Sequence, residues 1–93
     1  MRMEIIKDVR GVTMFKLIPL NKLPIGSRGR VKVLVSQGRL RRRMLDLGMI
    51  QDTVVEALRR SPAGDPVAYG IRGTVIALRA EEASKILVEP FSS

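Results

Sequence analysis

Short stretches in which hydrophobic and polar residues alternate recur along this chain, and each predicts a half-buried β-strand. The clearest one places Val31, Val33 and Val35 on one face and an arginine, a lysine and a leucine on the other. Another places Val67, Tyr69 and Ile71 on a shared face. Strands are expected over 15–18, 30–35, 53–59, 67–71, 74–78 and 87–88, which makes five or six short strands.

A helical period interrupts the strands once in the middle of the chain. Leu40, Met44 and Leu47 are spaced i, i+4 and i+7, which predicts a helix over 40–47 with one face toward a core. Gly48 follows at the C′ position, where the backbone commonly turns left-handed and ends a helix. A second short helix is predicted over 80–85, where helix-forming residues are concentrated.

Turn-forming residues separate these elements, and structural roles are expected for six of them: Gly29, Gly48, Gly64, Asp65, Pro66 and Gly73. Gly29 is expected in a turn that leads into the strand at 30–35. Gly73 fits the tight turn of a hairpin. In the loop at 61–66, Gly64 permits a positive φ, and Pro66 favours an extended conformation for the residue before it.

This order of elements predicts a mainly β fold. Strands this short cannot bury their apolar face in an open sheet, so we expect them to close into a small SH3-like β-barrel without an exposed edge. One short helix is inserted between its second and third strands, and another lies near the C-terminus. The barrel domain is assigned to 14–93. Residues 1–13 form an N-terminal extension, either a short strand or a loosely attached tail.

The chain contains no cysteine and no histidine, which limits its chemistry strongly. Disulfides, thiolate or imidazole metal sites and the commonest general base are all excluded. The four carboxylates Asp65, Glu81, Glu82 and Glu89 do not have the spacing of a calcium loop. Neither a P-loop nor a dinucleotide-binding glycine pattern occurs. We therefore expect no enzymatic activity, no cofactor and no dedicated metal site.

The net charge of +8 favours an anionic partner, whether nucleic acid, lipid headgroups or an acidic protein surface. A basic surface that only confers solubility is the alternative. No stretch approaches the roughly 20 apolar residues of a membrane-spanning helix. Charged residues occupy the start of the chain where a secretory signal would be apolar, so a soluble, cytoplasmic protein is expected.

The densest positive charge lies in the predicted helix and marks a candidate partner-binding surface. Arg41, Arg42 and Arg43 occupy successive positions and fan across its solvent side. Three cations near a helix N-terminus oppose the macrodipole, which favours a binding role over a merely solvated face. Asp46 lies four residues after Arg42 and three after Arg43, so it can pair with one of them.

Arg59 and Arg60 form a second basic pair at the end of a predicted strand. Successive strand residues point to opposite faces, so only one of the two can join a patch shared with the helix. Both are included as candidate partner-binding residues, with a solvated surface as the alternative.

The run from Leu20 to Val88 resembles the FeoA family of bacterial ferrous iron uptake. The resemblance is carried by Leu20, Leu23, Gly26, Gly29, Arg42-Arg43, Leu45-Asp46-Leu47-Gly48, Arg59-Arg60, Gly64-Asp65-Pro66, Arg72-Gly73 and Glu81-Glu82-Ala83. Two features depart from the family pattern. Gln51-Asp52 replaces the usual Pro-Gly turn, so Asp52 is expected to accept the strained conformation, and the N-terminal extension is atypical.

The resemblance implies an SH3-like fold, no enzymatic activity and one partner, FeoB, a membrane iron permease with a cytoplasmic GTP-binding domain. The leading hypothesis is a non-enzymatic module that docks on FeoB and modulates its transport or GTPase cycle. The alternative is a basic small-barrel domain that binds nucleic acid or belongs to an iron regulator. Only three aromatic residues are present, which weighs against nucleic acid, and self-association is left open.

Overall fold

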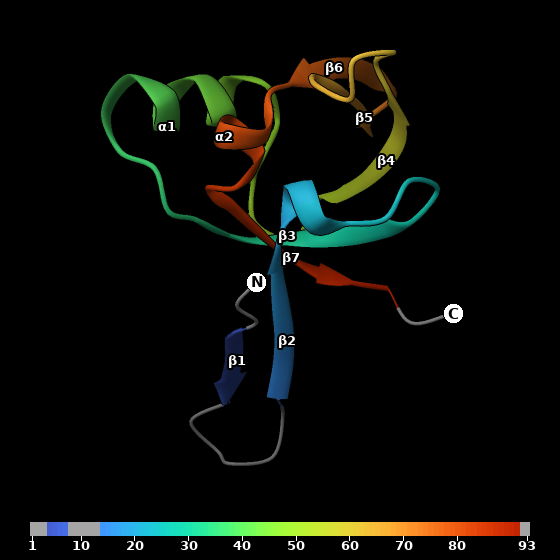
Figure 1. Ribbon diagram of the computed structural model, residues 1–93. Helices are drawn as coiled ribbons and strands as arrows, with labels where there is room; N and C mark the ends of the chain where they lie inside the picture. The colour runs from blue at the N-terminus through green and yellow to red at the C-terminus, as the bar shows by residue number, and fades with distance from the viewer. Residues whose placement is uncertain (1–3, 8–13, 92–93) are drawn as a thin grey trace.

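The computed structural model describes residues 4–7 and 14–91, with side chains from residue 16 onward. Its strands are β1 (Glu4–Lys7), β2 (Met14–Pro19), β3 (Arg28–Leu34), β4 (Val54–Arg60), β5 (Val67–Ile71), β6 (Thr74–Leu78) and β7 (Ile86–Pro90). Between them lie the 3-10 turn η1 (Leu20–Lys22) and the helices α1 (Gly38–Asp46) and α2 (Ala80–Ala83), as Figure 1 shows.

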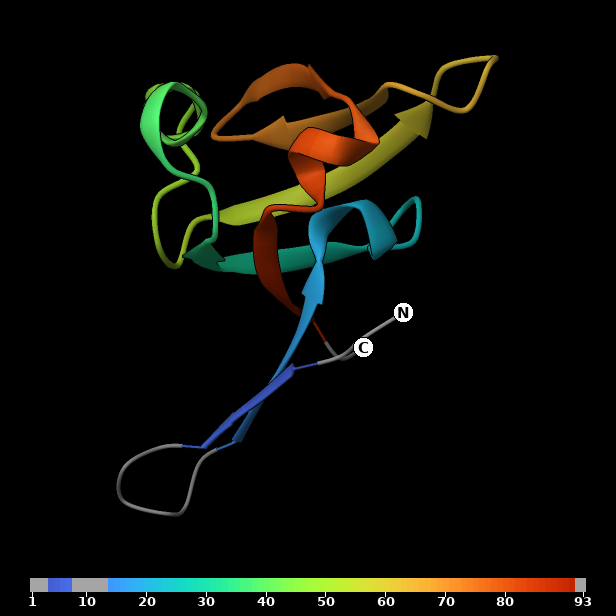
Figure 2. The same cartoon turned by 60° about the vertical axis from the view of Figure 1, so that its left-hand side comes forward.

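The strands form one antiparallel sheet in the order β1-β2-β7-β3-β4-β5-β6. The six strands β2, β3, β4, β5, β6 and β7 curl around a single core (Figure 2). Helix α1 lies on one side of this barrel, and η1 lies beside α2. The predicted mainly β architecture is confirmed. Helix α1 lies between β3 and β4, the second and third strands of the barrel, and α2 lies near the C-terminus.

The barrel is not closed by hydrogen bonds, contrary to the expectation. Within the described residues, β6 pairs only with β5, and no ladder joins it to β2. The reason is that α1 and the turn after it stand beside β6 in place of another strand, so Thr74 and Ile76 face Leu45 and Leu47 across a groove. The outer edge of β6 is therefore unpaired within the described residues.

The core is aliphatic, with one tyrosine. Val67, Tyr69 and Ile71 share the inner face of β5 as predicted, and Met44 is the fully buried residue of α1. The predicted burial of Val35 is wrong, because the side chain is 56% exposed. The pairing of β3 with β7 shifts register between Val31 and Val33, so the simple alternation of β3 is lost before its end.

Gly48 ends α1 with the predicted left-handed turn, at φ +100°. The Met49 N–H donates to the Met44 carbonyl and the Gly48 N–H to the Leu45 carbonyl, both at 3.0 Å, which is the Schellman pattern. Met44 and Met49 are both fully buried, so the turn also anchors two core side chains. This turn therefore ties the C-terminal end of α1 to the core.

Gly29 does not lie in a turn. It sits inside β3, opposite Pro90 of β7. A Cβ there would come within 3.1 Å of the Glu89 carbonyl oxygen and 3.3 Å of a Val88 methyl carbon. The glycine is therefore required by the close approach of β7, and the turn before β3 instead contains Gly26 at φ +91°.

The other predicted turn residues hold the positions expected of them. Arg72 and Gly73 form the two-residue loop between β5 and β6, both with positive φ, as a type I′ hairpin turn requires. Asp52 has a φ of +73°, which confirms that it accepts the strained conformation. Gly64 has a φ of +93°, and the Asp65–Pro66 peptide bond is cis.

The N-terminal extension is described in part. Glu4–Lys7 form β1, which pairs antiparallel with β2, so the strand alternative holds for this segment. Residues 1–3 and 8–13 lie outside the described residues. The assignment of 1–13 and 14–93 as extension and domain stays a prediction.

Candidate docking site

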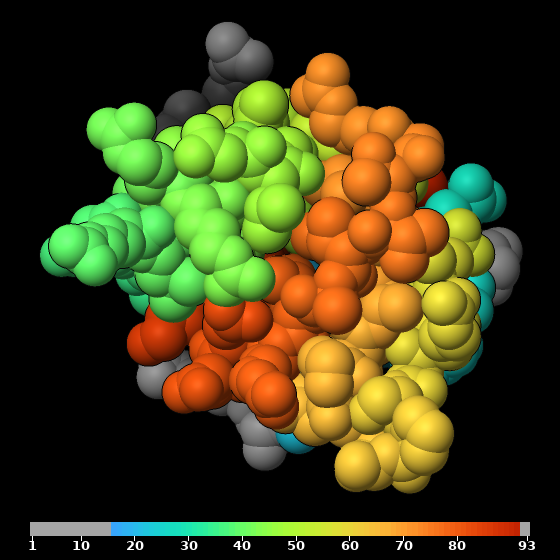
Figure 3. All heavy atoms as spheres, turned by 90° about the horizontal axis from the view of Figure 1, so that it is seen from above, coloured from blue at the N-terminus to red at the C-terminus, as the bar shows by residue number. Residues whose placement is uncertain are grey.

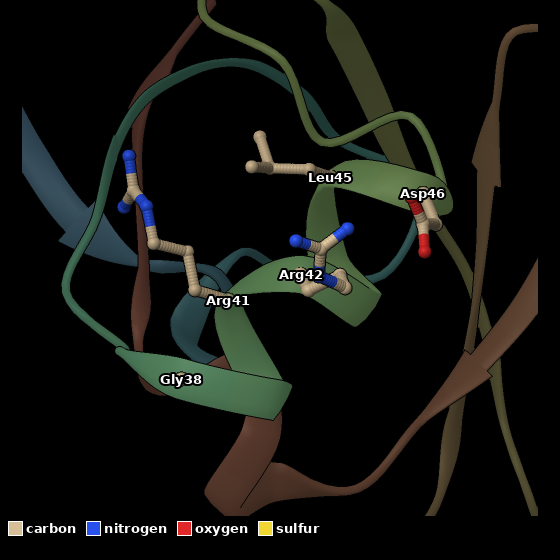
Figure 4. A pocket seen from close by; sticks show the side chains of 5 residues that line it. All are labelled: Gly38, Arg41, Arg42, Leu45 and Asp46. Atoms are coloured by element: carbon tan, nitrogen blue, oxygen red, sulfur yellow. The ribbon is translucent and has the colours of Figure 1, made fainter.

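The outer face of α1 presents the first part of a candidate site. Burial of Met44 turns the opposite side of the helix to solvent. Gly38, Arg41, Arg42, Leu45 and Asp46 line a shallow depression of about 330 Å³ there (Figure 4). In this view the guanidinium groups of Arg41 and Arg42 are separate from one another, and Leu45 lies above both. The depression thus combines one apolar side chain with two cations and one carboxylate.

Leu45 and Asp46 also belong to a larger groove of about 440 Å³ between α1 and the β5–β6 hairpin. Its walls are lined by Leu45, Asp46, Leu47, Gly48, Ile50, Ile71, Arg72, Thr74 and Ile76, and we call it the α1–hairpin groove. Figure 3 shows this face, with α1 and the following turn in green beside the hairpin in orange. The groove follows the unpaired edge of β6.

Large apolar side chains are exposed in this groove. Leu45 is 40% exposed and Ile50 is 47% exposed, whereas Leu47 and Ile76 are only partly buried against the core. A contiguous apolar surface bordered by charged residues is typical of a protein interaction site. The groove is therefore better suited to a protein segment than to a polar small molecule.

The groove is lined by one cation, Arg72, and one carboxylate, Asp46. Arg72 packs closely over the end of α1, since a Cβ at Gly48 would lie 3.1 Å from the Arg72 Cδ. Asp46 lies on the α1 side and forms no ion pair within the described residues. Arg42 is exposed in the adjoining depression, which shares Leu45 and Asp46 with the groove. The described residues thus do not form the pairing of Asp46 with Arg42 or Arg43 that the sequence spacing allows.

The three predicted arginines of α1 have different roles. Helix α1 begins at Gly38, so Arg43 lies in its last turn and complements the macrodipole, contrary to the prediction of a cluster at the N-terminus. Arg43 forms an ion pair with Glu82 of α2. Arg41 donates to the Leu34 carbonyl at 3.2 Å, and only Arg42 has no such contact among the described residues.

Glu82 is held from two sides. Its carboxylate accepts a hydrogen bond from the Arg79 backbone N–H at 3.0 Å and one from the Arg43 guanidinium. The Arg79 N–H is the larger cause and Arg43 the smaller, and together they outweigh partial burial and lower the pKa of Glu82. The ionised carboxylate thus joins α1 to α2.

Arg59 and Arg60 lie away from this site. They occupy the far end of β4, and Figure 2 places that end on the opposite side of the barrel from α1. Both are exposed, because the ladder with β5 shifts register between Ala57 and Arg59. The structure does not bring them together with Arg41 and Arg42.

Sequence reasoning did not identify the groove residues Leu45, Ile50 and Ile76 as site residues. Leu45 lies about 100° around the helix from Met44, outside the predicted core stripe. Its position off that stripe is a signal that could have marked it as an exposed apolar residue. Ile50 and Ile76 become neighbours of Leu45 only through the tertiary fold.

Within the described residues, no three His, Cys, Asp or Glu side chains gather as a metal site. No helix of the described chain is long and apolar enough to cross a membrane. Together, the fold and the groove define a class of protein: a small SH3-like barrel with an exposed apolar groove beside an edge strand.

The sequence belongs to the FeoA domain family, whose profile matches residues 18–90. The chain is 32% identical over 74 residues to the Fe(2+) transport protein A/Fe(2+) transporter FeoB fusion protein of Porphyromonas gingivalis. That match covers 80% of this chain and 9% of the relative, so the chain spans only a small part of the fusion protein.

Solved structures agree. The FeoA-like protein of Clostridium acetobutylicum is 35% identical, with a TM-score of 0.76 over 83% of this chain and 90% of that one. FeoA of Stenotrophomonas maltophilia, solved in complex with zinc and described as an SH3 domain protein, is 26% identical. Its TM-score is 0.68 over 75% of this chain and 87% of that one. The SH3-like fold is confirmed.

Proposed function

We propose that this chain is a non-enzymatic module of ferrous iron uptake that docks on the cytoplasmic part of a FeoB-type permease through the α1–hairpin groove. By occupying that part of the permease it modulates transport or the GTPase cycle. The observation that carries this proposal is the exposed apolar groove with Leu45 and Ile50 at its surface, beside an unpaired strand edge.

The fusion relative supports the choice of partner. There, a segment similar to this chain is part of the same polypeptide as a FeoB transporter. Covalent linkage raises the effective concentration of two modules for each other, which is useful when the modules interact. A chain that is not fused to the transporter lacks this linkage, so it needs a surface that binds the transporter non-covalently.

The groove also indicates what the partner segment looks like. Leu45, Leu47, Ile50 and Ile76 favour an apolar anchor, such as the hydrophobic face of a helix or alternate side chains of a strand. Because Arg72 lines the groove and Arg42 lines the adjoining depression, carboxylates beside that anchor would be attracted. We therefore expect an amphipathic segment with acidic residues beside its apolar face.

A pair of matched variants tests this proposal. Leu45 and Ile25 are both 40% exposed, but only Leu45 lines the groove. Leu45→Glu places an unpaired charge in the apolar surface and should weaken binding to the purified cytoplasmic part of FeoB at least tenfold in calorimetry. Ile25→Glu should bind like wild type. Equal affinity of all three proteins, each verified as folded by circular dichroism, would exclude the groove.

The nucleic-acid alternative finds less support in the described residues. Tyr69 is 1% exposed and cannot serve as a stacking surface. Phe91 is exposed, but its ring already has Arg30 at 5.3 Å and Arg28 at 5.7 Å from the centroid. A salt-dependent shift of a labelled single-stranded RNA by micromolar protein, lost in Phe91→Ala, would favour that alternative.

A further inference from the structure

A second cavity lies away from the α1–hairpin groove. It is a pocket of about 330 Å³ between η1, the end of β4, the following loop and the start of β5, and no residue lines both sites. Figure 2 shows the end of β4 on the opposite side of the molecule from α1. The pocket is polar, and Asn21, Lys22, Arg60, Asp65 and Tyr69 contribute its chemistry.

Asn21 carries an unsatisfied group in this pocket. Its Oδ1 is enclosed and has no hydrogen-bond partner. Leaving a buried amide oxygen unpaired is unfavourable, and native proteins rarely do so. The Nδ2 amino group is not enclosed and makes no hydrogen bond within the described residues, so it is the part of Asn21 that can donate to a ligand.

The two cations of the pocket are uncompensated. Lys22 ends η1 and Arg60 ends β4, and neither has an ion-pair partner in the part of the chain that the structure describes. The carboxylate of Asp65 is engaged elsewhere, since it accepts a hydrogen bond from the Ala80 N–H at 2.8 Å and lies 3.7 Å from the Arg79 guanidinium. The pocket therefore has excess positive charge.

Tyr69 forms the floor of the pocket. It is 1% exposed, and its hydroxyl makes no hydrogen bond within the described residues. Burial is the main cause that raises the pKa of Tyr69, while the charge of Arg60 lowers it and that of Asp65 raises it. The phenol is therefore neutral at pH 7, and its O–H is available to donate.

We infer that this pocket binds a small oxyanion, of the phosphate-ester or carboxylate class. Arg60 would hold two oxygens of the ligand, Lys22 would add a point charge, and the Tyr69 hydroxyl and the Asn21 amide would complete the shell. The volume is at the lower end of the range for small-molecule sites. The inference goes beyond docking on the permease and does not depend on it.

The chain itself supplies the probe for a test. Tyr69 is the only tyrosine and tryptophan is absent, so tyrosine fluorescence reports on this pocket alone. Titration with inorganic phosphate and, separately, with citrate should change the fluorescence to saturation for at least one of them. Sodium chloride at matched ionic strength should not. The same ligand should shift the backbone amide resonances of Lys22 and Gly64.

Two variants of equal charge separate a site from general attraction by a basic protein. Arg60→Gln removes a pocket cation and should weaken binding about tenfold or more. Arg59→Gln removes the neighbouring cation, which does not line the pocket, and should leave affinity unchanged. The inference would be overturned if neither anion changed the tyrosine fluorescence, or if the two variants lost the same affinity. Saturable changes of amide resonances centred on α1 would overturn it as well.

Discussion

Arg43 of α1 and Glu82 of α2 form an ion pair that bridges 39 positions of the sequence. The same carboxylate accepts the Arg79 backbone N–H, so one side chain both begins α2 and ties it to α1. One wall of the α1–hairpin groove is thereby fixed by a contact outside the groove. Arg43 therefore has a structural role, and Arg41 and Arg42 are the arginines of α1 that remain candidates for contacting a partner.

The lowered pKa of Glu82 predicts acid sensitivity. A carboxylate with a depressed pKa in the folded state stabilises the fold fully above its ordinary value of 4.5, and this contribution is lost as the pH falls through the folded pKa. Glu82→Gln should therefore be less stable than wild type at pH 7, with the difference in melting temperature shrinking below pH 4. Thermal melts from pH 7 to pH 3 measure this. A constant difference would contradict it.

Gly48 should tolerate substitution poorly. At φ +100° a β-branched residue is strained, and any Cβ would come within 3.1 Å of the Arg72 side chain. Gly48→Val should destabilise the domain by at least about 1–2 kcal/mol. Gly48→Asn should be less harmful, because asparagine enters this conformation more readily. If Gly48→Val melts within about two degrees of wild type, Gly48 is not needed as a left-handed residue.

The arginines of α1 should separate into two groups. Arg41→Gln with Arg42→Gln should weaken binding to the cytoplasmic part of FeoB several-fold at low salt, with a smaller effect at high salt. Arg43→Gln should instead lower stability by up to about 1 kcal/mol, since its ion pair with Glu82 is partly exposed. If Arg43→Gln weakened binding as much as the Arg41→Gln, Arg42→Gln double variant, Arg43 would have to be counted among the partner-binding residues.

Metal binding should be weak. The chain has only oxygen ligands to offer, because histidine and cysteine are absent. Calorimetric titration of metal-free protein with ferrous iron or zinc at neutral pH should show no one-to-one site of micromolar affinity. Detection of such a site would mean that carboxylates gather in a way that the sequence does not indicate.

Local rules predicted much of the fold. The spacing of Leu40, Met44 and Leu47 with a following glycine located α1, and alternation located Val67, Tyr69 and Ile71 on the inner face of β5. These signals involve only residues close in sequence. The Gly48 turn is confirmed for the same reason.

Features that depend on distant segments were not predictable in this way. The partner of Arg43 is Glu82 and not the nearby Asp46, because α2 returns beside α1 only in the folded chain. Gly29 is required by the approach of β7, not by a turn. The groove is assembled from α1, the turn after it and a hairpin, so periodicity within any single element could not reveal it.

Mapping the contact on the protein is the most direct test of the docking proposal. Isotope-labelled protein would be titrated with the unlabelled cytoplasmic part of FeoB, and backbone amide resonances followed. Docking through the groove predicts the largest changes at Leu45, Asp46, Ile50, Arg72 and Thr74, with little change at Arg59. Changes confined to the end of β4 or to β3 and β7, with the groove unaffected, would contradict it.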